Sequence, residues 1–144
     1  MQAFQTPDLL ETWVACGTKF GKTLSAAVAL GAVLPMRQQK VFRWVAPIYS
    51  QARIGQRYLT RMLPPEPYTK LNQYGLHIPS VQSMLEFHSG AWPENLEGEG
   101  VGGYVLDECS KLKEQVYASS RTTVSMTRGP ILGISTPRGK GWFY

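Results

Sequence analysis

Residues 13–23 read Trp13-Val14-Ala15-Cys16-Gly17-Thr18-Lys19-Phe20-Gly21-Lys22-Thr23, and this stretch decides the fold. Apolar residues lead into a glycine-bearing loop, which is followed by Gly-Lys-Thr and an alanine- and leucine-rich segment. The pattern predicts a strand, a phosphate-binding loop and a helix, because loop amides and a helix N-terminus together bind phosphate oxygens. Lys22 and Thr23 would complete a site for a nucleoside triphosphate with magnesium.

The loop departs from the pattern G-x-x-x-x-G-K-[ST] at its first glycine, where Cys16 stands and Gly17 follows one residue late. A bare Gly-Lys-Thr also fits an ordinary strand–turn–helix, so the rest of the chain has to decide. The predicted nucleotide-binding residues are Gly17, Thr18, Lys19, Phe20, Gly21, Lys22 and Thr23.

Length and composition indicate one globular domain of 144 residues, with 43% hydrophobic and 17% charged residues. The longest apolar run, residues 24–34, is too short to span a bilayer, and no secretory signal is visible. Cys16 and Cys109 lie far apart, which favours reduced thiols in the cytosol over a zinc site. The net charge of +5 is compatible with a polyanionic partner without identifying one.

Strands and helices are predicted to alternate along the chain. The expected strands are residues 12–16, 41–46, 84–88, 104–106 and 130–135, and the expected helices are residues 22–34, 50–62 and 113–123. Ser50 is the predicted N-cap of the second helix, with Ile54, Tyr58 and Met62 on one of its faces. Several strands are continuously apolar, which predicts an α/β fold with a mostly parallel sheet and helices on both faces.

Polar residues follow three of these strands, at Lys22-Thr23, Asp107-Glu108 and Ser135-Thr136. Ligands of such sheets bind outside the carboxyl ends of the strands, so these three groups are expected to meet. Asp107 is placed to hold magnesium beside Thr23. Glu108 can accept a proton from the water that attacks the γ-phosphate. The combination predicts a P-loop NTPase of the RecA-like (ASCE) class.

The chain resembles the N-terminal ATPase domain of the large terminase subunit of tailed bacteriophages, the motor that packages DNA. The similar segments are CGTKFGKT (16–23), FRWVAPIYSQAR (42–53), PENLEGEGVGGYVLDE (93–108) and ILGISTPRGKGWFY (131–144). They cover most of the chain in the family's order, which is far more specific than any single motif.

The resemblance implies a Mg²⁺-dependent ATPase. Lys22 and Thr23 would bind phosphate and magnesium, Asp107 would bind magnesium, and Glu108 would be the catalytic base. Ser135 and Thr136 would sense the γ-phosphate and couple hydrolysis to movement. The expected partners are double-stranded DNA, the portal, the small terminase subunit and, in a full-length protein, further copies in a ring. The expected location is the host cytoplasm at the procapsid, with no membrane contact.

Three features depart from the family. Lys19 follows Thr18 where many members carry a loop arginine, and Glu97 stands where some carry a trans-acting arginine finger. The third departure is at the N-terminus, where relatives usually have a longer lead-in whose glutamine reads adenine, and here only Gln2 or Gln5 is available. The chain also stops at Tyr144, where the family's nuclease domain would follow, so we expect residues 1–144 to be a single ATPase domain and a fragment, a split product or a degraded prophage gene.

Two other functions fit the motifs. One is a helicase-type or repair ATPase of the same P-loop class, and the other is a catalytically inactive prophage remnant. Arg53, Arg57 and Arg61 form a helical stripe that could contact DNA phosphates, although a solvated face is the preferred interpretation. Trp44 is expected in the core rather than as a base-stacking platform, and Cys109 as a small buried side chain.

Overall fold

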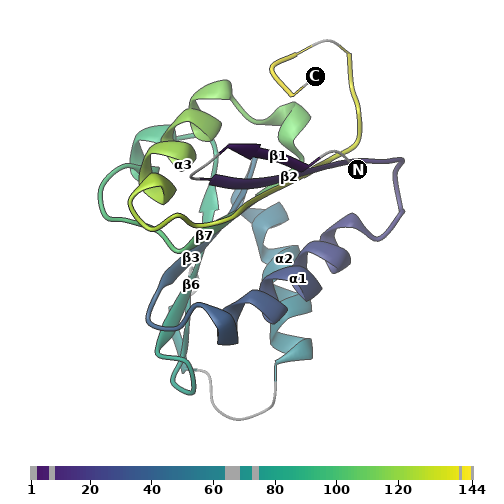
Figure 1. The fold of residues 1–144 in the computed structure, drawn as a ribbon. Helices are drawn as coiled ribbons and strands as arrows, with labels where there is room; N and C mark the ends of the chain where they lie inside the picture. Colours follow the sequence, from purple (N-terminus) through teal and green to yellow (C-terminus); the bar gives the residue numbers. More distant parts are fainter. Residues whose placement is uncertain (1–2, 7–8, 64–68, 73–74, 140, 144) are drawn as a thin grey trace.

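The computed structural model describes residues 3–6, 9–63, 69–72, 75–139 and 141–143, which form one twisted sheet with helices on both faces (Figure 1). The strands are β1 (Ala3–Thr6), β2 (Leu9–Ala15), β3 (Val41–Ala46), β4 (Thr69–Asn72), β5 (Gly75–Ile78), β6 (Ser83–Ser89), β7 (Gly103–Asp107) and β8 (Ile131–Ser135). The helices are α1 (Lys22–Val33), α2 (Tyr49–Met62) and α3 (Glu114–Ser125), and the short 3₁₀ turns are η1 (Leu34–Met36), η2 (Pro93–Leu96) and η3 (Cys109–Lys111).

The sheet has the strand order β1-β2-β8-β7-β3-β6-β5-β4. Strands β2, β8, β7, β3 and β6 are parallel, whereas β1 at one edge and β5 and β4 at the other run antiparallel to their neighbours. Strand β8 therefore lies between β2, which leads into the glycine loop, and β7, which ends at Asp107. The three predicted motifs therefore lie together at the carboxyl ends of the parallel strands β2, β7 and β8.

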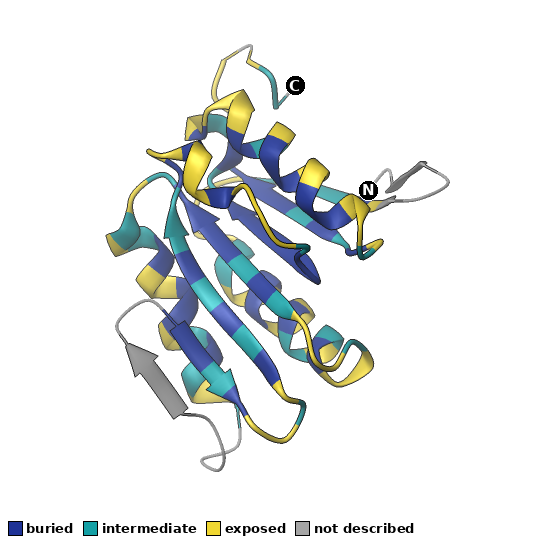
Figure 2. Cartoon of the chain, turned by 90° about the vertical axis from the view of Figure 1, so that its left-hand side faces the viewer, coloured by how far each residue is buried: buried dark blue, intermediate teal, exposed yellow. Residues whose placement is uncertain are grey.

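Two apolar clusters hold the layers together, one on each face of the sheet. On one face, α1 and α2 pack over β3 through Phe42 and Trp44. On the other face, α3 packs over β3 and β7 through Val45 and Leu106. In β3 and β6 some residues are buried and others are half-buried, whereas every residue of β7 is buried (Figure 2). The mostly parallel sheet, covered on both sides, confirms the predicted fold class.

Several predicted boundaries need correction. Strand β2 begins at Leu9 instead of residue 12, and β1 was not predicted at all. Helix α2 begins at Tyr49 after Ile48, without a side-chain cap, so the prediction of Ser50 as N-cap is wrong. Among the described residues, α2 is the longest helix at 14 residues, and none has the length and apolar content of a membrane span.

The buried face of α2 consists of Ala52, Gly55, Gln56 and Leu59. Ile54 and Met62 are more than a third exposed, so they do not form the main packing face that their spacing suggested. The physical reason is the bulk of Trp44 beneath the helix. A Cβ at Gly55 would lie 2.5 Å from the indole ring, so only a glycine lets the helix approach this closely.

Two other glycines, Gly133 and Gly31, test how tightly the helices and strands are packed. A Cβ at Gly133 in β8 would lie 2.2 Å from the Trp13 ring, whereas a Cβ at Gly31 in α1 would meet Met62 at an ordinary 3.8 Å. We expect Gly133→Ala to lower the free energy of unfolding by about 1–3 kcal/mol through overpacking. Gly31→Ala should raise it by about 0.5–1 kcal/mol, because alanine is the better helix former. Chemical denaturation of both variants measures the two changes, and equal effects would contradict the tight packing at Gly133.

Candidate functional site

The loop between β2 and α1 has the backbone that a phosphate-binding loop requires. Helix α1 begins at Lys22, and Gly21 before it adopts the left-handed conformation with φ of 75°. Lys19 is also left-handed, with φ of 61°. Left-handed residues turn successive backbone N–H groups toward one side, which creates a concave anion-binding surface. A Cβ at Gly17 would meet nothing within 4 Å, so the neighbouring atoms do not require a glycine at this position.

Lys22 connects the loop to the neighbouring strand. Its Nζ donates to Gly17 O at 2.7 Å, to Cys16 O at 3.2 Å and to Thr136 Oγ1 at 3.0 Å. The Cys16 backbone N–H also donates to Ser135 O at 3.2 Å. The first and third predicted motifs, more than 100 residues apart in the sequence, are therefore in direct contact.

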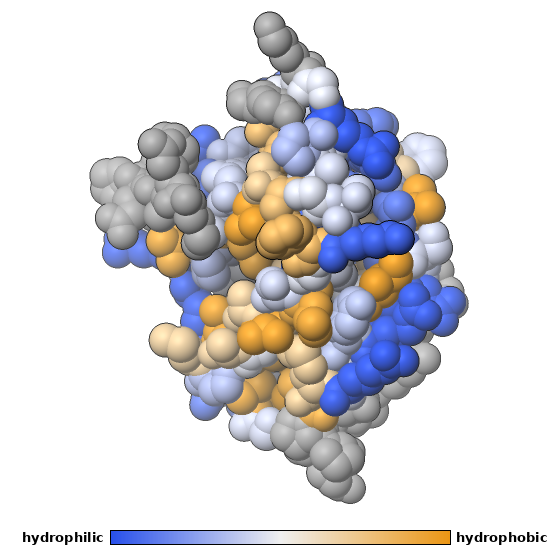
Figure 3. Space-filling view, turned by 90° about the vertical axis from the view of Figure 1, so that its right-hand side faces the viewer, coloured by the Kyte–Doolittle hydropathy of each residue, from blue (hydrophilic) through white to orange (hydrophobic). Residues whose placement is uncertain are grey.

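A hollow of about 310 Å³ opens in front of this loop. Its lining contains Thr18, Lys19, Phe20, Gly21, Lys22, Thr23, Leu24, Ile54, Tyr58, Glu108 and Thr136. Six of the seven predicted loop residues, the predicted base and one predicted coupling residue thus surround a single space, whereas Gly17, Asp107 and Ser135 do not line it. Figure 3 views the side of the molecule that carries the loop and α1, where apolar side chains lie beside strongly hydrophilic ones. The hollow combines cationic, hydroxyl and aromatic groups, as a nucleoside triphosphate requires.

Asp107 closes β7 and is only 6% exposed. Burial and the adjacent Glu108 carboxylate raise the pKa of Asp107 to about 6, while the Trp44 indole N–H and the Lys22 ammonium oppose this rise. Within the described residues, no three His, Cys, Asp or Glu side chains gather to hold a metal by themselves. Magnesium is typically held by one or two carboxylates together with substrate phosphates and water. Thr23 lines the hollow, whereas Asp107 is buried at the end of β7 and does not line it. One carboxylate and one hydroxyl are oxygen donors of the kind that this type of site uses.

Glu108 has two unusual properties. Its backbone is left-handed, with φ of 53°, which is uncommon for a residue with a side chain and which this protein also shows at Lys19, Gln39, Gln82 and Arg128. Its Oε2 atom is buried and has no hydrogen-bond partner among the described residues. An unsatisfied buried carboxylate oxygen calls for a partner such as a bound water. This is the environment that a general base needs.

Ser135 and Thr136 belong to a hydrogen-bond network that joins β8 to the segment after Glu108. Ser135 Oγ donates to Ser110 Oγ at 2.9 Å, the Ser110 N–H donates to Ser135 Oγ at 3.0 Å, and Ser110 Oγ donates to Thr136 O at 3.1 Å. Because Thr136 also accepts from Lys22, the network links the phosphate loop to the turn that carries Glu108.

Sequence reasoning missed four residues of this region. Ile54 and Tyr58 line the hollow from α2, Ser110 joins the polar network, and the Trp44 indole affects the pKa of Asp107. The spacing of Ile54 and Tyr58 on one helical face was visible, but it indicated core packing. Nothing in the local sequence marks Ser110 or Trp44, because both act through strands that are distant in the chain.

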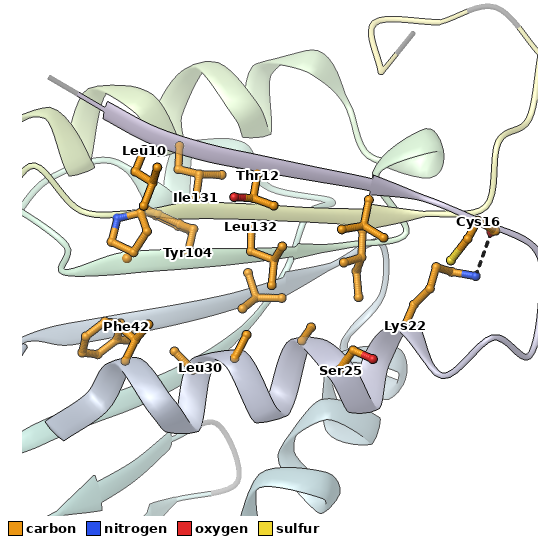
Figure 4. Close-up of a pocket in the computed structure, with 18 of the residues that line it drawn as sticks. Leu10, Thr12, Cys16, Lys22, Ser25, Leu30, Phe42, Tyr104, Ile131 and Leu132 are labelled. Atoms are coloured by element: carbon orange, nitrogen blue, oxygen red, sulfur yellow. Dashed lines mark hydrogen bonds between the residues drawn. The ribbon is translucent and has the colours of Figure 1, made fainter. Parts of the chain in front are cut away.

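A second, larger groove of about 500 Å³ runs along α1 over β2, β8 and β7 (Figure 4). Side chains such as Leu30, Phe42 and Leu132 line it. Lys22 lies at one end, where its Nζ donates a hydrogen bond to Cys16 O. The lining is mostly apolar, and Glu108, Thr23 and Thr136 are not part of it. The smaller hollow at the loop is therefore the candidate site.

No protein-family model and no curated protein matches the sequence. Among solved structures, the large terminase ATPase domain of Thermus phage P74-26 matches 92% of this chain with 27% identity and a TM-score of 0.76. A second large terminase, from a thermophilic bacteriophage, matches 90% of it in complexes with ADP (TM-score 0.76, 13% identity) and ATP-γ-S (TM-score 0.73, 14% identity).

The match covers 62% of the P74-26 ATPase domain, and 34% and 32% of the second terminase in its ADP and ATP-γ-S complexes. This chain therefore spans less than two thirds of the length of each relative.

Proposed function

We propose that this chain, a homologue of the ATPase domain of phage large terminases, binds ATP with Mg²⁺ and hydrolyses it for a motor that packages double-stranded DNA. The observation that carries the proposal is the meeting of three strand ends at one hollow. Lys22 and Thr136 are hydrogen-bonded there, and Glu108 lines the same space. The ADP and ATP-γ-S complexes of the second terminase support the choice of nucleotide.

Each residue has a distinct task in this proposal. The loop amides and Lys22 bind the β- and γ-phosphates, and Lys22 exchanges its bonds to Cys16 O and Gly17 O for phosphate oxygens. Thr23 and Asp107 would hold Mg²⁺, which would neutralise charge that develops on the transferring phosphoryl group. Glu108 accepts the proton of the attacking water through its buried, unpartnered oxygen.

Ser135 and Thr136 are the proposed coupling residues. The Thr136 hydroxyl accepts from Lys22, so a change in the position of Lys22 on nucleotide binding removes or redirects this bond. Thr136 O and Ser135 Oγ are in turn bonded to Ser110, two residues after Glu108. The state of the γ-phosphate is thereby communicated between β8 and the turn after β7.

The proposed partners are those of a packaging motor: double-stranded DNA, the portal, the small terminase subunit and other copies of the motor in a ring, at the procapsid in the host cytoplasm. The exposed arginines of α2, Arg53, Arg57 and Arg61, provide a positive stripe suited to a polyanion. Glu97 is exposed at the end of η2 and cannot act as an arginine finger.

Measuring ATP binding and hydrolysis by the purified chain, with and without double-stranded DNA, tests the proposal. We expect Mg²⁺-dependent binding of ATP. We also expect slow turnover, because Glu97 stands at the position of the arginine finger and such a finger is worth about 10³–10⁵ in rate. We also expect no nicking of plasmid DNA, since no carboxylate cluster for two metals exists among the described residues. Absence of nucleotide binding would overturn the proposal, and binding without any turnover would favour an inactive remnant.

A further inference from the structure

Helix α2 carries an exposed face on which all the charges are positive. Arg53, Arg57 and Arg61 are exposed and follow one another at intervals of four residues, so they lie side by side along the helix. The helix contains no acidic residue, and within the described part of the chain none of the three guanidinium groups forms an ion pair. Ile54, which is 37% exposed, lies on the same face of the helix, between these arginines. Like charges at this spacing repel each other, so the face is suited to an anionic partner.

Residues 92–99, which contain η2, form an acidic counterpart. Glu94, Glu97 and Glu99 are exposed there, and they are three of the four exposed acidic residues in the described part of the chain. The stretch contains no lysine or arginine, and none of the three carboxylates forms an ion pair with another described residue. Trp92 at its start is 63% exposed. Tryptophan is enriched among the residues that dominate the energy of protein–protein contacts, so the stretch has both the charge and the apolar anchor of a binding surface.

The acidic stretch is firmly attached to the rest of the molecule. Leu96 is fully buried in the apolar cluster beneath α3, and its carbonyl oxygen accepts a hydrogen bond of 2.9 Å from Arg43 Nη1. Arg43 is itself held by an ion pair of 2.8 Å with Glu86. Ala52 and Leu59 of α2 belong to the other apolar cluster, on the opposite face of the sheet (Figure 1). The acidic stretch and the arginine face of α2 therefore cannot meet within one molecule.

We propose that the arginine face of α2 binds residues 92–99 of a second copy of this chain. Three unpaired positive groups then face three unpaired negative groups, and Trp92 of one copy packs against Ile54 of the other. Because two different surfaces meet, the contact is head to tail, and its repetition yields a closed ring or an open filament. The role of this contact in a motor rests on the proposed function, whereas the contact itself does not depend on ATP binding.

Double-stranded DNA is the other polyanion that suits the arginine face. DNA accounts for the arginines alone, however, and leaves the exposed Trp92 and the three unpaired glutamates without a partner. Those carboxylates would also repel the DNA phosphates wherever the two came close. A second copy of the chain accounts for both surfaces with one contact, so it is the partner that the charges favour.

Sedimentation of the nucleotide-free protein tests the contact. We expect the parent protein to associate as its concentration rises, and raised salt to reverse the association because it screens the charges. One double variant carries Arg57→Glu and Arg61→Glu, and the other carries Glu94→Arg and Glu97→Arg. Each variant alone should have a dissociation constant raised by about tenfold or more, because like charges then face each other. An equimolar mixture should associate again, since the unchanged acidic stretch of one variant meets the unchanged α2 of the other.

Arg128→Glu is the matched control, because it makes the same charge reversal at an exposed position between α3 and β8, outside both surfaces. It should associate like the parent protein. Association of both double variants at the parental concentration, or a mixture that stays monomeric, would contradict the proposed contact.

A parent protein that stays monomeric at every concentration would also overturn the proposal. Loss of duplex binding by the Arg57→Glu, Arg61→Glu variant would in that case identify DNA as the partner of α2. Absence of ATP binding in a protein that associates as expected would refute only the proposed function.

Discussion

Replacing Lys22 with alanine is expected to weaken binding of an ATP analogue with Mg²⁺ by about 100-fold or more. A hydrogen bond to a charged group contributes roughly 1.5–3 kcal/mol, and each 1.4 kcal/mol is a factor of ten in affinity. Lys22 Nζ makes three hydrogen bonds in the structure, to Cys16 O, Gly17 O and Thr136 Oγ1, so it is already directed at the mouth of the loop. Two such bonds to phosphate oxygens account for the expected loss, which a binding titration measures.

The control for Lys22→Ala must separate the local contact from the overall charge of a protein with a net charge of +5. Lys40→Ala removes the same charge from an exposed position just before β3, at the opposite end of the strand from the hollow. It should leave the affinity within a factor of about two, since exposed charges more than a Debye length of about 8–10 Å away are largely screened. Equal affinities of Lys22→Ala and the parent protein would mean that the loop is an ordinary turn.

The strand–loop–helix unit could be predicted because its determinants are local. Gly21 supplies the left-handed residue before α1, and the apolar residues before it have the pattern of a buried strand. The convergence of Lys22 and Thr136 was also predictable, since the carboxyl ends of parallel strands share an edge. A general rule of topology was sufficient here, without knowledge of the strand order.

Other features depend on which strands become neighbours, and local sequence does not contain that information. The buried face of α2 was mispredicted because it is set by the Trp44 ring from β3, against which only Gly55 fits. Ser110 joins the site because β8 lies between β2 and β7, which brings Ser135 within 2.9 Å of its hydroxyl. Strand β1 lies at the edge of the sheet beside β2, and its four residues show too little pattern to be recognised.

Glu108→Gln should slow ATP hydrolysis by about 10²–10⁴ while leaving the affinity for Mg²⁺-ATP nearly unchanged, because a general base acts on the attacking water and contributes about this much to the rate. The buried Oε2 of Glu108 has no partner among the described residues, so an amide of the same shape fits the space but cannot accept the proton. Single-turnover hydrolysis and a binding titration separate the two effects. Asp107→Asn should behave differently, since it removes the proposed magnesium ligand and should raise the Mg²⁺ requirement.

Glu99→Gln is the matched control for Glu108→Gln, because it makes the same chemical change at an exposed position in the loop before β7. It should hydrolyse ATP like the parent protein. The left-handed backbone of Glu108 adds a second control, since Glu108→Gly relieves the strain at φ of 53° while also removing the carboxylate. If backbone strain alone mattered, the Glu108→Gly and Glu108→Gln variants would hydrolyse ATP at different rates. If the carboxylate is the base, both variants should be slow, and hydrolysis at the parental rate by Glu108→Gln would show that the proton goes elsewhere.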